Sequence, residues 1–391
     1  MRILYLDWPC FGKIDTQNTL IQAGHEFVPF FHKDYQERTS ASFDKFFDDF
    51  VGDTIYDCCF SFNYFAIVSE NCKRHDLKYI SVVYDSPYVM LYSYTLINPN
   101  NYVFLFDKHE YLTFRNSGIE TVYYSPLPVN GTKIEHLLAK EYNHNRLSSE
   151  VSFVGALYNE EHNFFDRLTD ISDYTKGYLE AIMEAQLKVQ GYNFIEEVLT
   201  PDIVADLQKA VPYTPMPSGT ESSEYVYANY FINRKLTALE RHRLLTAAAV
   251  HCKDLKIYTL NPNATIPGAR NMGAVDYYSE MPYVFANSKI NLNISLRSIQ
   301  SGIPLRAMDI MGAGGFLLTN FQADFLDYFV PGEDFVYYES EEDMVSKIEY
   351  YLSHEKERTE IAHNGHEKVK SNHSFEKFFA NIFEVVFGNI S

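Results

Sequence analysis

The sequence predicts an α/β protein with two domains, each built on a mostly parallel β-sheet. Its 391 residues are more than one ordinary hydrophobic core accommodates, which favours two domains. In both halves, short apolar segments of strand length alternate with helical segments, which is the pattern of βα units. A polar stretch at 140–150, KEYNHNRLSSE, separates the halves and is typical of a linker.

Six apolar segments of strand length run through the N-terminal half, beginning with RILYLD. They lie at 2–7, 27–31, 57–63, 79–85, 103–107 and 121–126. Helical segments connect them, so we expect a parallel sheet in a first domain at 1–145. Such sheets bind ligands at the carboxyl ends of their strands. Polar residues just after these segments are therefore candidates for a site.

The C-terminal half begins a new βα unit at VSFVGALYN, residues 151–159. A helical region follows at about 160–250, with a break at YTPMPSGTESS. Strand-like segments return at 255–260, 288–296, 314–320 and 335–339, which define a second domain at 150–372. Six apolar residues within 373–391 share helical spacing, which predicts a C-terminal helix that docks back onto another surface. They are Phe375, Phe378, Phe379, Ile382, Phe383 and Val386.

The composition excludes several classes of partner. A formal net charge of −19 disfavours a nucleic-acid backbone or an anionic membrane surface, so an anionic ligand needs a local basic pocket. The five cysteines form no CxxC pair and indicate reduced thiols. The N-terminal residues do not resemble a signal peptide, and no apolar run reaches the roughly 18 residues of a membrane span. We therefore expect a cytoplasmic protein.

Residues 295–320, SLRSIQSGIPLRAMDIMGAGGFLLTN, combine a strand end, a glycine-rich loop and a short helix. Ser301 and Gly302 precede an Ile-Pro pair, and proline favours the first turn of a helix. The glycines at 312–315 end that helix and admit the next strand. A helix N-terminus offers unpaired N–H groups and a positive dipole end, so this one predicts an anion site.

Two arginines and a carboxylate surround this predicted helix start. Arg297 and Arg306 are near enough in sequence to bind phosphate oxygens. Asp309, further along the helix, suits a pair of vicinal hydroxyls such as those of a ribose. An anion followed by a diol is the outline of a nucleotide. The alternative is that Arg306 and Asp309 form an ordinary i,i+3 surface pair and that the glycines only make a tight turn.

The block from Asp276 to His373 resembles the glycosyltransferases of the CgeB-like, spore-maturation group, which have the GT-B fold. The resemblance lies in DYYSEMPYVFANSKINLNISLRSIQSGIPLRAMDIMGAGGFLLTN and in FLDYFVPGEDFVYYESEEDMVSKIEYYLSHEKERTEIAHNGHEKV. In the N-terminal half, YDSP at 84–87 and the strand before it are similar to a poorly characterised domain often attached to such enzymes. The resemblance implies two Rossmann-like domains facing a cleft, with the donor nucleotide held mainly by the second. It also implies a bacterial protein.

The resemblance implies roles for particular residues on the donor side. Asp309 falls where many GT-B enzymes carry a carboxylate, more often glutamate, that contacts the donor ribose. Many retaining enzymes carry a second glutamate where this chain has Gly302, so the stereochemical outcome stays open. Ser301 and Gly302 would then offer their backbone to the diphosphate. The expected donor is a nucleotide sugar, UDP-linked by analogy with relatives, and no other cofactor is expected.

Further donor-side candidates follow from the same resemblance. FVGALYN is similar to the glycine loop that opens the donor domain, with Gly155 letting backbone approach the donor. Tyr258 and the segment Gly273-Ala274-Val275, ending at Val275, are candidate walls for the base. Arg243 and Arg270 are further candidates for the diphosphate, with surface arginines as the alternative.

Transfer of a sugar needs a stabilised leaving diphosphate and, for inversion, a base for the acceptor hydroxyl. Asp85, just after the strand at 79–85, is the first candidate base, and a turn cap is its alternative role. Asp7, at the end of the first strand, is the second, and His25 and His109 are weaker candidates.

No metal site is expected, since GT-B enzymes usually stabilise the diphosphate with helix dipoles and basic side chains. No DxD motif ends a strand, and the acidic runs Asp48-Asp49 and Glu341–Asp343 indicate solvated charge. His363, His366 and His373 have irregular spacing on a polar helical stretch, which favours surface histidines over a zinc site.

The leading hypothesis is therefore a metal-independent glycosyltransferase with a nucleotide-sugar donor and an acceptor that is a glycan, a protein or a lipid-linked molecule. One alternative is a sugar-nucleotide epimerase of the same fold, against which the absence of a carboxylate at Gly302 argues. The other is a non-catalytic protein that binds sugar nucleotides.

Overall fold

The computed structural model describes residues 1–140, 146–159 and 163–388, and these divide into two compact units. Unit 1 contains Met1–Leu127, Thr214–Ser222 and the segment that begins at Phe375. Unit 2 contains Pro128–Tyr213 and Ser223–Ser374. The predicted linker at 140–150 and the predicted boundary at 145 fall partly on 141–145, which lie outside the described residues. Residues 389–391 of the predicted C-terminal segment also lie outside them.

Unit 1 is built on a six-stranded sheet in the order β2-β1-β3-β4-β5-β6, and every neighbouring pair is parallel. Central strands such as CCFSF and YISVV are buried along their whole length, because helices cover both faces of a parallel sheet. All six strands were predicted and are confirmed. They are β1 (Arg2–Leu6), β2 (Glu26–Phe30), β3 (Cys58–Phe62), β4 (Tyr79–Val83), β5 (Asn101–Leu105) and β6 (Val122–Tyr124).

Side-chain caps define where several helices of unit 1 begin. The Ser40 hydroxyl accepts a hydrogen bond from the Phe43 amide at the start of α2, and the Asp107 carboxylate accepts from the first amides of α4. The helices of the N-terminal part are α1 (Lys13–Gln22), α2 (Ala41–Val51), α3 (Ala66–Arg74) and α4 (Lys108–Asn116), with 3-10 turns at Val89–Leu91 and Tyr94–Ile97.

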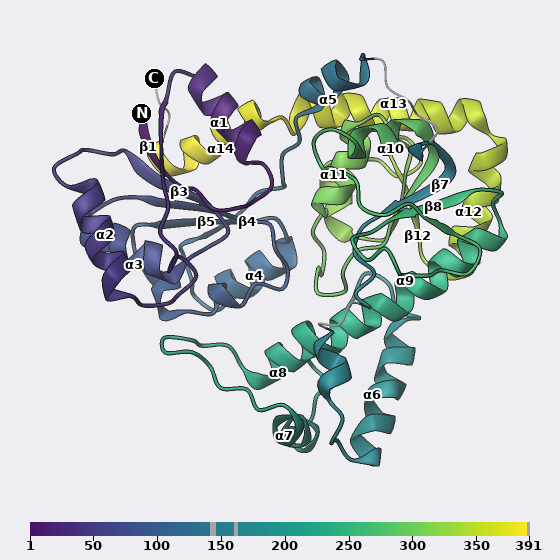
Figure 1. The fold of residues 1–391 in the computed structure, drawn as a ribbon, viewed down its shortest axis with the longest axis horizontal. Helices are drawn as coiled ribbons and strands as arrows, with labels where there is room; N and C mark the ends of the chain where they lie inside the picture. Colours follow the sequence, from purple (N-terminus) through teal and green to yellow (C-terminus); the bar gives the residue numbers. More distant parts are fainter. Residues whose placement is uncertain (141–145, 160–162, 389–391) are drawn as a thin grey trace. The chain divides into compact units, whose positions relative to one another are not determined.

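The C-terminal helix α14 (Phe375–Phe387) packs onto the sheet of unit 1 beside α1 (Figure 1). The rings of Phe60 on β3 and Phe379 on α14 lie 5.5 Å apart. The Lys78 ammonium donates to the Val386 carbonyl at the end of the helix, at 2.6 Å. The predicted C-terminal helix that docks back is therefore confirmed, and its apolar face is the predicted one.

The segment Thr214–Ser222 interrupts the helical region of the C-terminal half but belongs to unit 1. Arg38 and Glu221 form an ion pair at 3.4 Å with almost no exposed side chain. The Tyr94 amide donates to the Ser218 carbonyl and the Thr220 amide to the Tyr92 carbonyl. The sequence analysis included this segment in the second domain. Its contact with unit 1 leaves no local signal in the sequence, because the buried ion pair joins residues 183 positions apart.

Unit 2 contains a second parallel six-stranded sheet in the order β12-β11-β10-β7-β8-β9. Numbered within the unit, this is the order 3-2-1-4-5-6 of the dinucleotide-binding α/β fold. The order in which strands are added to the sheet reverses between β7 and β10, which are parallel neighbours, so their carboxyl ends form the topological switch point. The strands are β7 (Ser149–Val154), β8 (Leu255–Tyr258), β9 (Arg270–Asn271), β10 (Ser288–Asn293), β11 (Leu317–Asn320) and β12 (Val336–Tyr338).

Two hydrophobic clusters cover the two faces of this second sheet. One packs under α9 and α12 through residues such as Leu245 and Ile348. The other packs under α10 and α11 through residues such as Val284 and Met308. The helices are α5 (Gly131–Leu138), α9 (Asn233–Val250), α10 (Met281–Asn287), α11 (Leu305–Gly312), α12 (Glu341–Ser353) and α13 (Glu355–Asn372), with 3-10 turns at Phe164–Arg167 and Ala323–Asp327.

The predicted helical region at about 160–250 is confirmed over its described residues. It consists of α6 (Asp173–Gln186), α7 (Pro201–Ala210) and α8 (Ser223–Val226), followed by a π-helical turn (Tyr227–Ile232) that runs into α9. In Figure 1, α6 and α7 lie apart from the strands of unit 2. A π-turn of this kind often marks a functional position in a helix.

Candidate functional site

The switch point of unit 2 is formed by the residues that follow β7 and β10. Gly155 comes directly after β7, and its amide donates to the Tyr258 carbonyl at 3.0 Å. A Cβ at Gly155 would lie 3.3 Å from the Phe153 ring, which is closer than most Cβ contacts. The predicted glycine loop therefore stands at the edge of the sheet where ligands bind in this class of fold.

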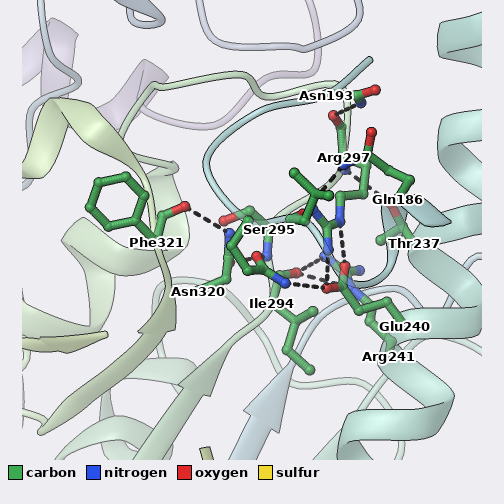
Figure 2. Close-up of polar contacts among 12 residues, drawn as sticks. Gln186, Asn193, Thr237, Glu240, Arg241, Ile294, Ser295, Arg297, Asn320 and Phe321 are labelled. Atoms are coloured by element: carbon green, nitrogen blue, oxygen red, sulfur yellow. Dashed lines mark hydrogen bonds and ion pairs between the residues drawn. The ribbon is translucent and has the colours of Figure 1, made fainter. Parts of the chain in front are cut away.

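Arg241 on α9 connects the two loops of the switch point, and Figure 2 labels it together with Ile294, its acceptor after β10. Its guanidinium donates to the Ala156 carbonyl after β7 and, through Nε at 3.0 Å, to the Ile294 carbonyl after β10. Burial lowers the pKa of Arg241. Sequence analysis did not identify this residue, since its carbonyl acceptors are 85 and 53 residues away and leave no local pattern.

Arg297 lies beside it but is paired inside the protein. Its guanidinium donates to both carboxylate oxygens of Glu240, at 2.8 and 2.5 Å, and to the Val189 carbonyl at 2.9 Å. The two charged side chains are only 8% and 6% exposed. Asn193, in the loop after α6, donates to the Arg297 carbonyl, so the helical region is fastened to the loop after β10 (Figure 2).

The short helix α11 begins directly after Pro304, as predicted, and carries Asp309. The Asp309 carboxylate is 4% exposed and accepts hydrogen bonds from the Tyr277 hydroxyl at 2.9 Å and from Arg306 at 3.1 Å. Burial and the nearby Asp309 charge raise the pKa of Tyr277 well above its ordinary value. Arg306 and Asp309 thus form the i,i+3 pair that the sequence left as an alternative, but its carboxylate is buried.

The glycines after α11 have structural reasons of their own. Gly314 adopts φ +70°, where residues with a side chain are strained. A Cβ at Gly315 would lie 2.7 Å from the Asn291 amide nitrogen, and one at Gly312 would lie 2.8 Å from Val129. Helix end and close packing therefore account for these three glycines. Before the helix, Ser301 accepts a hydrogen bond through its carbonyl from the Asp324 amide, and Gly302 is buried.

The predicted walls for the base lie close to one another. The Tyr258 hydroxyl donates to the Arg146 carbonyl at 2.8 Å, and the Arg146 guanidinium donates to the Ala274 carbonyl at 2.8 Å. Tyr258 is buried in a core cluster, so its ring offers almost no surface to a ligand. Val275 is partly buried against the same cluster. Their contact with a base stays a prediction.

Two predicted arginines are not brought to the switch point. Arg270 pairs with Asp254, which directly precedes β8, and therefore lies toward the amino-terminal edge of the sheet. Arg243 forms an exposed ion pair with Glu184 on α6. Ligands of such sheets bind at the carboxyl edge, at the switch point. The positions of Arg270 and Arg243 therefore do not support the predicted role at the diphosphate.

In unit 1, both predicted carboxylates lie at the carboxyl edge of the sheet. Asp7 follows β1 and pairs with Lys13 at the start of α1. Asp85, which is exposed, follows β4 and accepts a hydrogen bond from the Asn63 side chain at 2.7 Å. Asn63 follows β3 with φ +56° and accepts the Tyr84 amide through its own side-chain oxygen. Asn63 thus orients the candidate base Asp85. The sequence analysis did not predict this role of Asn63.

The weaker histidine candidates differ in position. His25 precedes β2 at the amino-terminal edge of the sheet and contacts the N-terminal amine at 3.3 Å. His109 lies in the first turn of α4, at the carboxyl edge. The next residue, Glu110, has a pKa raised to about 8, mainly by burial and also by the Asp107 carboxylate. A carboxyl group with a raised pKa at this edge was not predicted, since nothing local in the sequence shows its surroundings.

The prediction of surface histidines on the polar helical stretch is wrong for two of the three. His366 and His373 are buried, and only His363 is exposed. His366 contacts Glu135 on α5 at 3.0 Å, and ligand atoms of Glu135, His366 and Glu367 lie within 4.8 Å of one another. The Lys370 ammonium donates to both Glu135 oxygens, at 2.6 and 2.7 Å. The Lys370 ammonium group thus neutralises the Glu135 carboxylate, which would be one of the ligands of a metal ion at this position.

Comparison with known proteins supports this arrangement of the sheets. Residues 234–384, less than half of the chain, match the family described as "Glycosyl transferase-like", and this range includes α11. No curated protein sequence gives a significant match. Among the described residues, no helix is long and apolar enough to cross a membrane.

Solved structures match over nearly the whole chain. Sucrose-phosphate synthase from Thermosynechococcus elongatus has 9% identity, 98% coverage of both chains and a TM-score of 0.57. A glycosyltransferase from Rickettsia africae ESF-5 has 11% identity, 99% coverage of both chains and a TM-score of 0.57. HepE from Anabaena, solved with UDP-glucose, has 9% identity, 99% coverage of both chains and a TM-score of 0.51.

The chain has the GT-B fold. The predicted fold class, two parallel α/β sheets with a returning C-terminal helix, is confirmed. At these identities the structural likeness establishes the fold and leaves the reaction to be inferred from the site residues.

Proposed function

We propose that this protein is a glycosyltransferase that moves a sugar from a nucleotide sugar to an acceptor hydroxyl. The observation that carries the proposal is the buried Asp309 carboxylate on α11, within the region that matches the glycosyltransferase-like family. It follows the switch point of a sheet with the dinucleotide-binding strand order. The resemblance of Asp276–His373 to the CgeB-like group adds to this, and HepE, solved with UDP-glucose, favours a UDP-linked hexose donor.

In this proposal, unit 2 binds the donor. The ribose hydroxyls donate to Asp309, and Arg306 beside it contributes positive charge near the diphosphate. The first amides of α11, Leu305 and Arg306, have no backbone acceptor within the described chain and suit phosphate oxygens. Charge from a helix end and an arginine supports leaving-group stabilisation without a metal ion.

The proposed reaction breaks the bond between the anomeric carbon and the diphosphate oxygen, whose electron pair leaves with the nucleotide. The acceptor oxygen forms a new bond to the anomeric carbon, and its proton passes to a base. Asp85, held by Asn63 at the carboxyl edge of unit 1, is the proposed base, with Asp7 as the second candidate.

Calorimetry tests the donor proposal directly. UDP, GDP and their sugar conjugates are titrated without added metal into wild-type protein and the Asp309→Ala variant. We expect UDP to bind and Asp309→Ala to weaken it by about 1–3 kcal/mol, the value of hydrogen bonds to a charged group. Asp334→Ala is the matched control, because Asp334 is another buried carboxylate of unit 2 but pairs with Lys368 and the Val330 amide.

Three results separate the possibilities. Release of free sugar or product from one conjugate identifies the donor and supports a transferase. Nucleotide binding without any turnover, also in the presence of acceptors, supports a binding protein instead. If no nucleotide binds to the wild-type protein, the glycosyltransferase proposal is wrong.

A further inference from the structure

An unusual feature of unit 1 is a group of aromatic residues that follow strands β2, β1 and β4 at the carboxyl edge of the sheet, in which β3 lies between β1 and β4. Trp8 lies two residues after β1, Phe31 directly after β2, and Tyr84 directly after β4. Tyr35, in the loop after β2, joins them. We call Phe31, Tyr35, Trp8 and Tyr84 the aromatic row.

Ring contacts connect the members of the aromatic row in order. The ring centroids of Phe31 and Tyr35 are 5.9 Å apart, those of Tyr35 and Trp8 are 6.1 Å apart, and those of Trp8 and Tyr84 are 6.5 Å apart. The last two rings are nearly parallel, with an interplanar angle of 13°. The Trp8 indole N–H donates to the Phe62 carbonyl at 3.0 Å, which fixes the ring against the end of β3.

The aromatic row is not fully absorbed by the core. Phe31 is 52% exposed, and Trp8, Tyr35 and Tyr84 are each partly exposed. Aromatic side chains usually dominate cores because of the area they bury. A contiguous group of them left open at the ligand-binding edge of a parallel sheet indicates a binding surface.

Carboxylates stand beside these rings. Asp85 immediately follows Tyr84 and is held by Asn63, while Asp7 immediately precedes Trp8 and is paired with Lys13. Ring faces favour flat apolar surfaces, and carboxylates accept hydrogen bonds from hydroxyl groups. An alkyl chain would have to desolvate the carboxylates without forming hydrogen bonds to them, and an anionic group beside Tyr84 would meet the like charge of Asp85. A sugar ring offers both a face of C–H groups and a rim of hydroxyls.

We propose that the aromatic row binds a neutral oligosaccharide, so that the acceptor of the reaction is a saccharide. This inference rests on the proposed glycosyltransferase function and adds the chemical class of the acceptor. The aromatic rings hold the sugar by stacking, and Asp85 accepts a hydrogen bond from a hydroxyl at its edge.

The single tryptophan of the chain, Trp8, is a built-in reporter for this surface. Its fluorescence is followed while neutral malto-, cello-, xylo- and chito-oligosaccharides, and 1-octanol as an alkyl probe, are titrated into the full chain. We expect at least one oligosaccharide series to change the emission saturably, and 1-octanol not to. The variants Tyr84→Ala and Asp85→Asn should each weaken that oligosaccharide about three- to tenfold.

Tyr94→Ala is the matched control, because Tyr94 is a tyrosine of the same unit that is 68% exposed and outside the aromatic row. It should leave the affinity unchanged, and circular dichroism spectra should show that all three variants are folded. The conservative Asp85→Asn variant keeps the test valid if Tyr84→Ala does not fold.

The proposal is overturned if no oligosaccharide changes the Trp8 emission, if 1-octanol alone does, or if Tyr94→Ala weakens binding as much as Tyr84→Ala. UDP binding is measured by calorimetry on the same samples. UDP binding without oligosaccharide binding contradicts the aromatic-row inference and leaves the transferase proposal standing. Oligosaccharide binding without any nucleotide binding contradicts the transferase proposal and leaves the aromatic row standing as a saccharide-binding surface.

Discussion

The Arg297→Met variant distinguishes a structural role for this arginine from the ligand-binding role that its sequence position suggests. The guanidinium makes bonds of 2.8 and 2.5 Å to Glu240 and one of 2.9 Å to the Val189 carbonyl. Removal of one partner from a buried pair leaves an uncompensated charge and costs about 3–5 kcal/mol. With both side chains less than a tenth exposed, we expect a loss of this size in the free energy of unfolding.

The double variant Arg297→Met/Glu240→Leu should recover most of that loss. Replacing a whole buried pair by apolar residues is often neutral or stabilising. The bond from Arg297 to the Val189 carbonyl and the bond from the Gln190 side chain to Glu240 are not replaced, and each is worth about 1 kcal/mol. Arg243→Met is the control, since its pair with Glu184 is exposed and should contribute less than about 1 kcal/mol.

Urea unfolding followed by circular dichroism measures these differences, and hydrogen exchange at 189–195 reports on the loop that Arg297 holds. We expect faster exchange there in Arg297→Met and near-normal exchange in the double variant. The reasoning is refuted if Arg297→Met changes the unfolding free energy by less than about 1 kcal/mol and still abolishes UDP binding. That result would make Arg297 a diphosphate ligand, as its place in the sequence suggests.

Two further predictions concern single positions. Gly191→Ala should destabilise the protein by about 1–3 kcal/mol in urea unfolding. The reason is that Gly191 adopts φ +73° and a Cβ there would lie 2.7 Å from the Phe321 ring. Unchanged stability would show that this loop is not packed as described. Glu110, whose pKa is raised to about 8 in the folded state, binds more protons there than in the unfolded chain. The contribution of Glu110 to the free energy of unfolding is therefore complete below its unfolded pKa, near 4.5, and is lost as the pH rises toward 8. The urea midpoint of the wild-type protein should decline between pH 5 and about 8, and Glu110→Gln should make this decline smaller.

The strands and most helices of this protein could be predicted because their signals are local. RILYLD and SKINLNISL are apolar runs of strand length between turn residues, and they contain β1 and β10. Pro304 and the glycines after residue 311 mark the start and end of α11, since their backbone preferences act at their own positions. β9 was missed because only Arg270 and Asn271 form it, which is too short for any periodicity.

The partners of the charged residues could not be predicted, because they come from distant parts of the chain. Arg297 meets Glu240, 57 residues away, and Arg241 meets carbonyl groups on two different loops. The sequence shows that an arginine is near a helix start but not whether a buried carboxylate already neutralises it. The same limit applies to His366, which is buried against Glu135 from another helix although its neighbours in the sequence are polar.

This pairing changes how a nucleotide diphosphate would be bound in unit 2. Arg297, Arg243 and Arg270 each have a carboxylate partner that is not part of α11, so their charge is already compensated in the protein. Arg306 differs, because its partner Asp309 is itself the proposed ribose ligand and both belong to the helix whose first amides are open to an anion. In a chain with a net charge of −19, the proposed site would therefore attract phosphate through one helix end and one arginine rather than through a broad basic patch. If the proposed site is correct, it should select a ligand that carries both a diphosphate and a diol at a fixed separation, and it should bind simple polyanions more weakly, because they would use only half of it.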